Sequence, residues 1–92
     1  MTVALSDMVV RRKEVLVASL SDGQVLLDPE SQNYVGLDQV GSAIWKRIDA
    51  RTSVTLLCEE LTQMFEGDPR TIEADTLRFL NRLIELNLAQ KL

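Results

Sequence analysis

Residues 26–45 read LLDPESQNYVGLDQVGSAIW, and this stretch decides the fold. Two leucines end an apolar run, and the proline and polar residues after them are typical of a turn. The next five residues, 33–37, are expected to form a strand, with Tyr34 and Gly36 pointing to one side and their neighbours to the other. Apolar residues then recur at helical spacing from Val40 onward. A strand is therefore expected to lead directly into a helix.

The segment before this stretch is expected to form a β-hairpin. Residues 15–20 are mostly apolar and contain β-branched side chains, and residues 24–28 form a second such run. Ser21-Asp22-Gly23 lies between them, and an Asp-Gly pair between apolar runs is a strong hairpin signal. Together with residues 33–37, these runs predict three short antiparallel strands. The N-terminal segment, residues 1–14, is expected to be either a short strand around residues 8–10 or a frayed tail.

Three helices are expected to follow the strands. Asp38 is a good N-cap for the first, which is expected to end near Asp49. Thr52 or Ser53 caps the second, which Gly67 is expected to end. Asp68-Pro69 starts the third, which runs to about Asn87. Their apolar stripes are Val40, Ile44 and Ile48 with Trp45 beside them, then Val54, Leu57, Cys58, Leu61, Met64 and Phe65, then Ile72, Phe79, Leu80, Leu83, Ile84 and Leu86.

This order of elements predicts a single α+β domain, with a three-stranded antiparallel sheet followed by three helices. Short helices joined by tight turns next to a small sheet suggest a winged helix-turn-helix-like arrangement. One apolar face of the sheet must be covered, and three amphipathic helices are able to cover it.

The composition argues against several classes of function. The 92 residues include no histidine and one cysteine, so the commonest general base and the usual zinc ligand sets are missing. We therefore expect no catalytic activity, no metal and no cofactor, and we expect Cys58 to be a buried structural thiol. The net charge of −4 disfavours nucleic acid and anionic membranes as partners. The lone thiol, with no signal peptide or membrane span visible, favours a cytoplasmic location.

An ordered set of short motifs resembles the PqqD-like family. The set consists of Leu26-Leu27-Asp28-Pro29-Glu30-Ser31, Tyr34-Val35-Gly36-Leu37-Asp38, Gly41-x-x-Ile44-Trp45, Asp68-Pro69, Asp75 and Phe79-Leu80-x-x-Leu83. The resemblance covers residues 15–92, which it marks as a PqqD-like peptide-recognition domain. One departure is Asn87, where relatives often carry glycine, although asparagine also accepts a positive φ.

The resemblance implies a recognition element for ribosomally made, post-translationally modified peptides (RiPPs). Such a domain binds the leader of a precursor peptide and presents it to a modifying enzyme or leader protease, as in lasso-peptide or quinone-cofactor biosynthesis. The leader is expected to add as a strand beside residues 33–37 and to face the third helix, with Gly36 leaving room for its backbone. The peptide-binding residues implied are Asn33, Tyr34, Val35, Gly36, Leu37, Asp75, Arg78, Phe79, Arg82 and Leu83.

Several alternatives stay open on the sequence alone. Tyr34 either packs on the sheet or contacts a ligand, and Gly36 either marks a β-bulge or leaves room for the leader. Phe79 belongs either to the core or to the groove. Arg78 and Arg82 either bind leader carboxylates or are solvated, and the basic run at residues 11–13 is read as solvated. The other functions considered are a winged-helix DNA-binding regulator and an unrelated adaptor or dimerisation domain. A homodimer through an exposed edge strand is possible.

Overall fold

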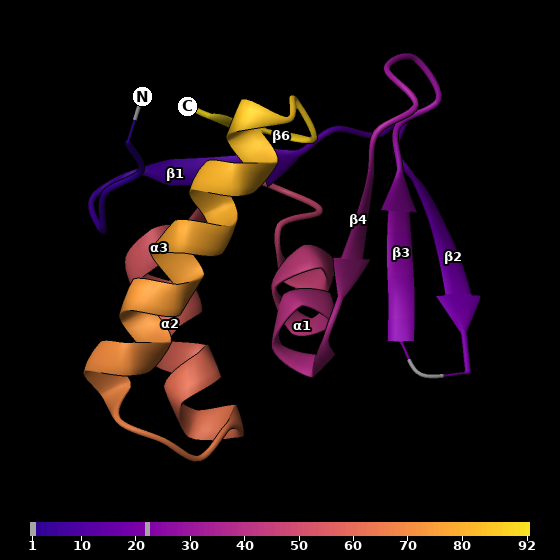
Figure 1. Ribbon diagram of the computed structural model, residues 1–92. Helices are drawn as coiled ribbons and strands as arrows, with labels where there is room; N and C mark the ends of the chain where they lie inside the picture. The colour runs from indigo at the N-terminus through magenta and orange to yellow at the C-terminus, as the bar shows by residue number, and fades with distance from the viewer. Residues whose placement is uncertain (1, 22) are drawn as a thin grey trace.

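The computed structural model describes residues 2–21 and 23–92, which form two three-stranded antiparallel sheets and three helices (Figure 1). The strands are β1 (Met8–Arg11), β2 (Leu16–Leu20), β3 (Gly23–Leu27), β4 (Tyr34–Leu37), β5 (Thr52–Ser53) and β6 (Ala89–Lys91). The helices are α1 (Gln39–Arg47), α2 (Val54–Met64) and α3 (Pro69–Glu85). The α+β class, the antiparallel sheet β2–β3–β4 and the three helices that follow it confirm the prediction.

The predicted strands form one sheet in the order β2–β3–β4, each antiparallel to the next. Within the predicted hairpin turn, Asp22 lies outside the described residues, but the strands on both sides pair as expected. Gly23 has a φ of +155°, and a Cβ at this position would lie 2.9 Å from the carbonyl oxygen of Leu37. Glycine is therefore required where β3 begins, because a side chain would collide with the end of β4.

The second sheet was not predicted from the sequence. Its order is β5–β1–β6, so the strand suggested at residues 8–10 lies at its centre as β1. Val9 pairs with Lys91 on one side and with Thr52 on the other. The two ends of the chain therefore meet in one sheet, close to α2 and α3 (Figure 1).

The helices begin at the predicted caps. Asp38 accepts a hydrogen bond from the N–H of Gly41 at 2.7 Å, and Ser53 and Asp68 cap α2 and α3 in the same way. Pro69 occupies the first turn of α3, and Asn87, just beyond the end of that helix, has a φ of +61°. Two details differ: α1 ends at Arg47, two residues before the predicted end, and Met64 is exposed rather than buried.

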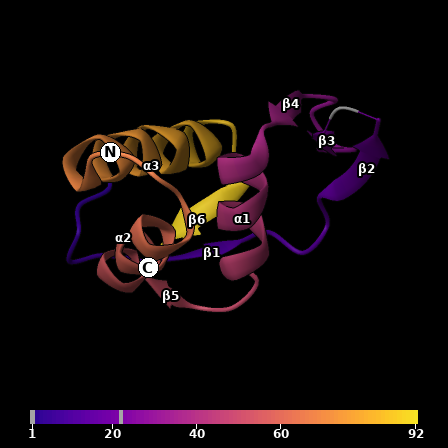
Figure 2. The ribbon, with the colours of Figure 1, turned by 90° about the horizontal axis from the view of Figure 1, so that it is seen from below.

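Helix α1 lies between the two sheets, and its buried face is central to the core (Figure 2). Ile44, Trp45 and Ile48 are all buried, as expected for an apolar stripe. The expectation that three helices cover the β2–β3–β4 sheet is wrong, because α2 and α3 lie next to the other sheet and away from β2 and β3 (Figures 1 and 2). As a result, all five residues of β2 are exposed.

The basic run at residues 11–13 is not simply solvated. The guanidinium of Arg11 stacks over the Trp45 ring, 5.2 Å from its centroid, and donates to the Trp45 carbonyl oxygen at 2.8 Å. Arg12 donates to the carbonyl oxygen of Asn87 at 2.7 Å and lies 3.4 Å from a carboxylate oxygen of the buried Asp28. These two arginines therefore tie the end of β1 to α1, to the loop after β3 and to the turn after α3.

Asp28 is held in its ionised form. The Ser31 hydroxyl donates to its carboxylate at 2.8 Å and lowers the pKa of Asp28 below the ordinary value of 3.8. The backbone N–H of Glu30 and the charge of Arg12 act in the same direction, against the opposing effect of burial. The loop between β3 and β4 is thus organised around one buried carboxylate.

We expect this carboxylate to contribute to the acid stability of the fold. Because its pKa is lower in the folded than in the unfolded state, its contribution is complete above pH 3.8 and is lost as the pH falls through the folded-state value. Ser31→Ala should raise the pKa of Asp28, measured by NMR titration, and move the acid-unfolding midpoint to higher pH. Ser19→Ala, on exposed β2, is the matched control. An unchanged Asp28 pKa in Ser31→Ala would contradict this account.

Candidate functional site

The register of β4 separates its side chains into two sets. Val35 and Leu37 are buried against the core, whereas Tyr34 and Gly36 point to the opposite, solvent-exposed face of the sheet. Cross-strand pairing fixes this arrangement, because Tyr34 stands opposite Leu27 and Gly36 stands opposite Val25. Tyr34 is 73% exposed, so it does not pack within the domain.

The same register directs the backbone groups of β4. The N–H of Asp28 donates to the carbonyl of Asn33, which makes these two residues a hydrogen-bonded pair. Such pairs alternate along antiparallel strands, so Val35 and Leu37 bond to β3 while the N–H and C=O groups of Tyr34 and Gly36 point away from it. Since β4 is the edge of its sheet, these four groups form a row on which another strand can pair.

Opposite this edge stands α3, and the first turns of α1 form the floor between them. A pocket of about 200 Å³ is lined by Asp38, Val40, Gly41, Ile44, Asp75 and Phe79. A second pocket, of about 270 Å³, continues along α3 between Asp75, Arg78, Phe79 and Arg82. Phe79 lines both pockets and also packs against the core. It therefore belongs to the core and to the groove, the two alternatives that the sequence left open. Together these pockets form a groove with an apolar floor and a charged rim.

The predicted site residues fall into three groups in the structure. Asn33, Tyr34 and Gly36 are exposed at the edge, and Asp75, Phe79 and the two arginines line the groove. Val35 and Leu37 contribute their backbone to β4, but their side chains face the core. Leu83 is completely buried, so its side chain supports the helix from within and does not reach the groove.

The charged rim is partly paired already. Arg78 donates to Asp75 at 2.7 Å, one helical turn away, and both side chains are exposed. An exposed pair of this kind contributes little to stability, so it is able to rearrange around a charged ligand.

Sequence reasoning missed the floor of the groove. Val40 and Ile44 were assigned only to the apolar stripe, although they line the pocket as well. Gly41 was noted as part of a motif, and a Cβ at this position would lie 3.3 Å from an oxygen of Asp38 and 3.5 Å from the Phe79 ring. A glycine inside a predicted helix is the signal that marks such a close approach.

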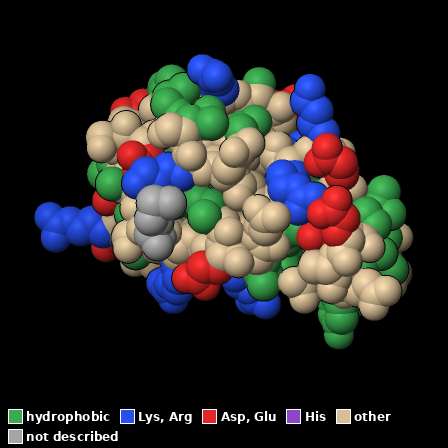
Figure 3. All heavy atoms as spheres, turned by 90° about the horizontal axis from the view of Figure 1, so that it is seen from above, with side chains coloured by type: hydrophobic (Ala, Val, Ile, Leu, Met, Phe, Trp, Pro, Cys, Tyr) green, Lys and Arg blue, Asp and Glu red, His purple; other side chains and the backbone are tan. Residues whose placement is uncertain are grey.

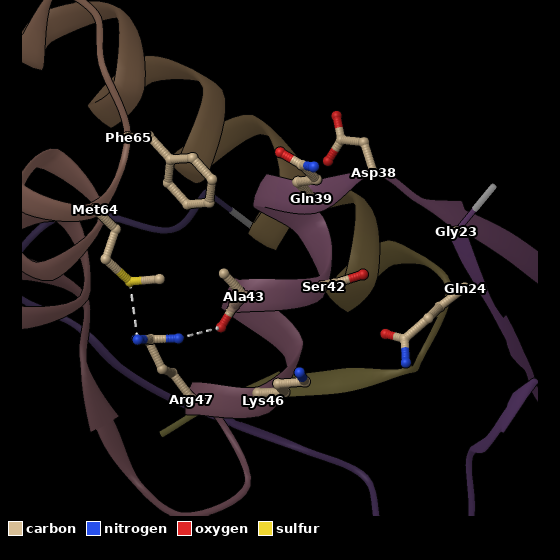
Figure 4. Close-up of a pocket in the computed structure, with 10 residues that line it drawn as sticks. All are labelled: Gly23, Gln24, Asp38, Gln39, Ser42, Ala43, Lys46, Arg47, Met64 and Phe65. Atoms are coloured by element: carbon tan, nitrogen blue, oxygen red, sulfur yellow. Dashed lines mark hydrogen bonds between the residues drawn. The ribbon is translucent and has the colours of Figure 1, made fainter. Parts of the chain in front are cut away.

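A larger hollow, of about 430 Å³, lies on another side of α1, between that helix and the end of α2 (Figure 4). Met64, the last residue of α2, and Phe65 just after it point into the hollow, and Arg47 faces them from α1 (Figure 4). Arg47 is held in place by the carbonyl oxygen of Ala43 and the carboxylate of Glu60. The hollow shares Asp38 with the groove and reaches Gly23 and Gln24 at the start of β3, but no residue of β4 lines it.

The described residues hold no cluster of three or more metal-binding side chains, and their helices are too short or too polar to cross a membrane. Cys58 is buried, as predicted, and burial raises the pKa of its thiol. A buried, protonated thiol is a poor nucleophile. What the groove does offer is an open strand edge, an apolar floor and charged side chains, which are the means of binding an extended peptide.

The family model described as coenzyme PQQ synthesis protein D (PqqD) matches residues 23–89. This chain belongs to the PqqD family. The matched residues include β4, α1 and α3, which together form the edge and the groove. No curated protein matches the chain.

Three solved structures have the same fold. TbiB1, in complex with the TbiA(beta) leader peptide, is 28% identical and has a TM-score of 0.75, with 88% of this chain and 94% of that one covered. A lasso peptide synthetase B1 complexed with its leader peptide is also 28% identical, with a TM-score of 0.75 and coverage of 89% and 96%. The PqqD truncation of Methylobacterium extorquens PqqCD, a stand-alone RiPP recognition element, is 29% identical, with a TM-score of 0.77 and coverage of 95% and 93%.

Hydrogen exchange tests the direction of the backbone groups in this PqqD-family chain. The N–H groups of Tyr34 and Gly36 point to solvent, whereas those of Val35 and Leu37 bond to β3. We therefore expect the amides of Tyr34 and Gly36 to exchange at least about ten-fold faster than those of Val35 and Leu37, measured by NMR in deuterated buffer. Equal protection along the four residues would contradict the register.

Proposed function

We propose that this chain binds the leader of a ribosomally made precursor peptide and presents that precursor to a modifying enzyme or leader protease. The observation that carries the proposal is the outward-facing edge of β4, which stands opposite α3 across the first turns of α1. The two relatives solved with leader peptides share this fold, which supports the proposal. A lasso peptide synthetase B1 and a PqqD recognition element share this fold equally, so the proposal names a leader peptide as the ligand and leaves the final product open.

The leader would bind as an additional strand along β4. Its backbone would pair with the N–H and C=O groups of Tyr34 and Gly36, which gives affinity that depends little on side chains. Selectivity would come from the groove, where an apolar leader residue fits the pocket beside Phe79 and a leader carboxylate reaches Arg82.

The domain would act by tethering and not by chemistry. Holding the leader keeps the attached core peptide near the enzyme and raises its effective concentration there. Such a role requires a binding edge and a second contact with the enzyme, and it requires no reactive side chain. The absence of histidine from the sequence is consistent with this role.

Binding of DNA is less well supported. Helix α2 would be the recognition helix of a winged helix-turn-helix domain, and reading DNA requires basic side chains that reach phosphates and bases. This helix carries Glu59 and Glu60 and no lysine or arginine. Its charge would repel the phosphate backbone instead of neutralising it. The third helix, α3, carries Arg78 and Arg82, but it also carries Glu73, Asp75 and Glu85.

A titration of the isotope-labelled protein with the leader half of the precursor encoded nearby tests the proposal directly. We expect saturable amide shifts concentrated on residues 33–37 and 75–83. Duplex DNA of matched concentration serves as the comparison. If DNA shifted α2 and α3 with a strong salt dependence while the leader shifted nothing, the regulator function would replace this one.

Substitution of Gly36 separates backbone pairing from other contacts. Gly36→Pro removes the N–H that faces the incoming strand, on an edge where proline is tolerated, so leader affinity should fall about ten-fold or more while the fold persists. In Gly36→Ala the added Cβ points to the outer face of the sheet, where it meets no atom of this chain within 4 Å, and the N–H at the edge is kept, so binding should stay within about two-fold of wild type. Calorimetry gives the affinities and circular dichroism verifies folding. Equal affinities for the two variants would exclude strand pairing at this position.

The charged rim gives a further test. Arg82→Gln should lower the affinity for an acidic leader by about two- to five-fold at low salt. The difference in affinity between this variant and wild type should shrink as salt is added. Arg70→Gln is the matched control, because Arg70 is exposed on the same helix but lies outside the groove. A loss of affinity that is the same in both variants would mean that only the overall charge matters.

A further inference from the structure

The outer face of the β2–β3–β4 sheet is apolar and uncovered. Cross-strand pairing places Leu16, Leu27 and Tyr34 in one row and Ala18, Val25 and Gly36 in the next, with Leu20 beyond them. Leu16 and Leu20 are each 56% exposed and Leu27 is 39% exposed. Figure 3 shows hydrophobic side chains gathered at the right-hand end of the molecule, where this sheet lies.

This face is also hollowed at one end. A depression of about 340 Å³ is lined by Leu20, Gly23, Val25 and Gly36, together with Gln24, Leu37 and Asp38. A Cβ at Gly36 would meet no atom within 4 Å, so the absence of a side chain there leaves the space open. None of the described residues of β2, β3 and β4 is charged. The shape and chemistry suit an apolar side chain that protrudes from another protein.

We propose that the enzyme that processes the bound precursor docks on this outer face. The inference rests on the proposed function, because tethering requires a second contact between the domain and the enzyme. The face is continuous with the leader site. A strand added at the β4 edge places every second side chain on the outer face, beside Tyr34 and Gly36. The enzyme would then contact the domain and its bound substrate on one continuous surface.

The size of the face favours this partner over a second copy of the chain. Three strands about 4.8 Å apart and five residues long, at about 3.3 Å per residue, cover roughly 240 Å². A stable interface buries about 800 Å² on each partner. The face alone is therefore small for a stable homodimer. Even with a bound leader strand it suits a transient contact, one that forms with substrate and ends with processing.

Leu20→Lys tests docking without touching the leader site. Leu20 lies on β2, which β3 separates from the edge that binds the leader. Ser19→Lys is the matched control, because it adds the same charge to an exposed position of the same strand on the opposite face. The readouts are leader affinity by calorimetry and the rate at which the enzyme encoded with the precursor processes it. Leu16→Lys is the second outer-face variant, and circular dichroism monitors folding.

We expect both Leu20→Lys and Leu16→Lys to bind the leader within about two-fold of wild type but to lower the processing rate by about ten-fold or more. Ser19→Lys should leave both quantities within about two-fold of wild type. Normal processing by the two outer-face variants, with leader binding intact, would overturn this inference alone. A wild-type chain that did not bind the leader would overturn the proposed function and this inference with it. A wild-type dimer in sedimentation that Leu20→Lys dissociates would assign the face to a second copy of the chain.

Discussion

Burial of Val35 and Leu37 beneath the sheet is the constraint on which the rest of the site depends. Because side chains alternate along a strand, burying these two residues places Tyr34 and Gly36 on the solvent face. Because hydrogen-bonded pairs also alternate, it turns the backbone of the same two residues toward the open edge. A shift of one residue would reverse both features. The core therefore specifies the binding edge, although it contributes no side chain to it.

Arg12 links the two walls of the groove at one end. It contacts the carbonyl of Asn87, where α3 ends, and Asp28, where the loop to β4 begins. At the other end of β4, Gly41 brings α1 within contact distance of Phe79. The spacing between β4 and α3 is therefore set by the charged side chain of Arg12 and by the absence of a side chain at Gly41. Arg12, whose side chain is only 16% exposed, thus holds the two walls together at one end of the groove.

The sequence was most informative where local chemistry determines structure. Asp38, Ser53 and Asp68 cap their helices because each side chain bonds to nearby backbone N–H groups. β5 and β6 could not be predicted in this way, since two or three residues are too few to show a period and their partner lies far away in sequence. The roles of Arg11 and Arg12 were missed for the same reason, because their partners are distant in the chain. At the site, the edge and the helix positions followed from the family resemblance, whereas the α1 floor and the burial of Leu83 required the packed structure.

The central position of β1 determines the order in which the chain is able to fold. During synthesis β1 emerges before the other described strands, yet Val9 pairs with Lys91, which is far along the chain. The β2–β3 hairpin and the junction of β4 with α1 rely on local contacts, which form quickly. The β5–β1–β6 sheet forms completely only when β6 has left the ribosome. A nascent chain would therefore display the β4 edge before α3 is fixed opposite it, and the groove would be completed only after β6 has paired with β1.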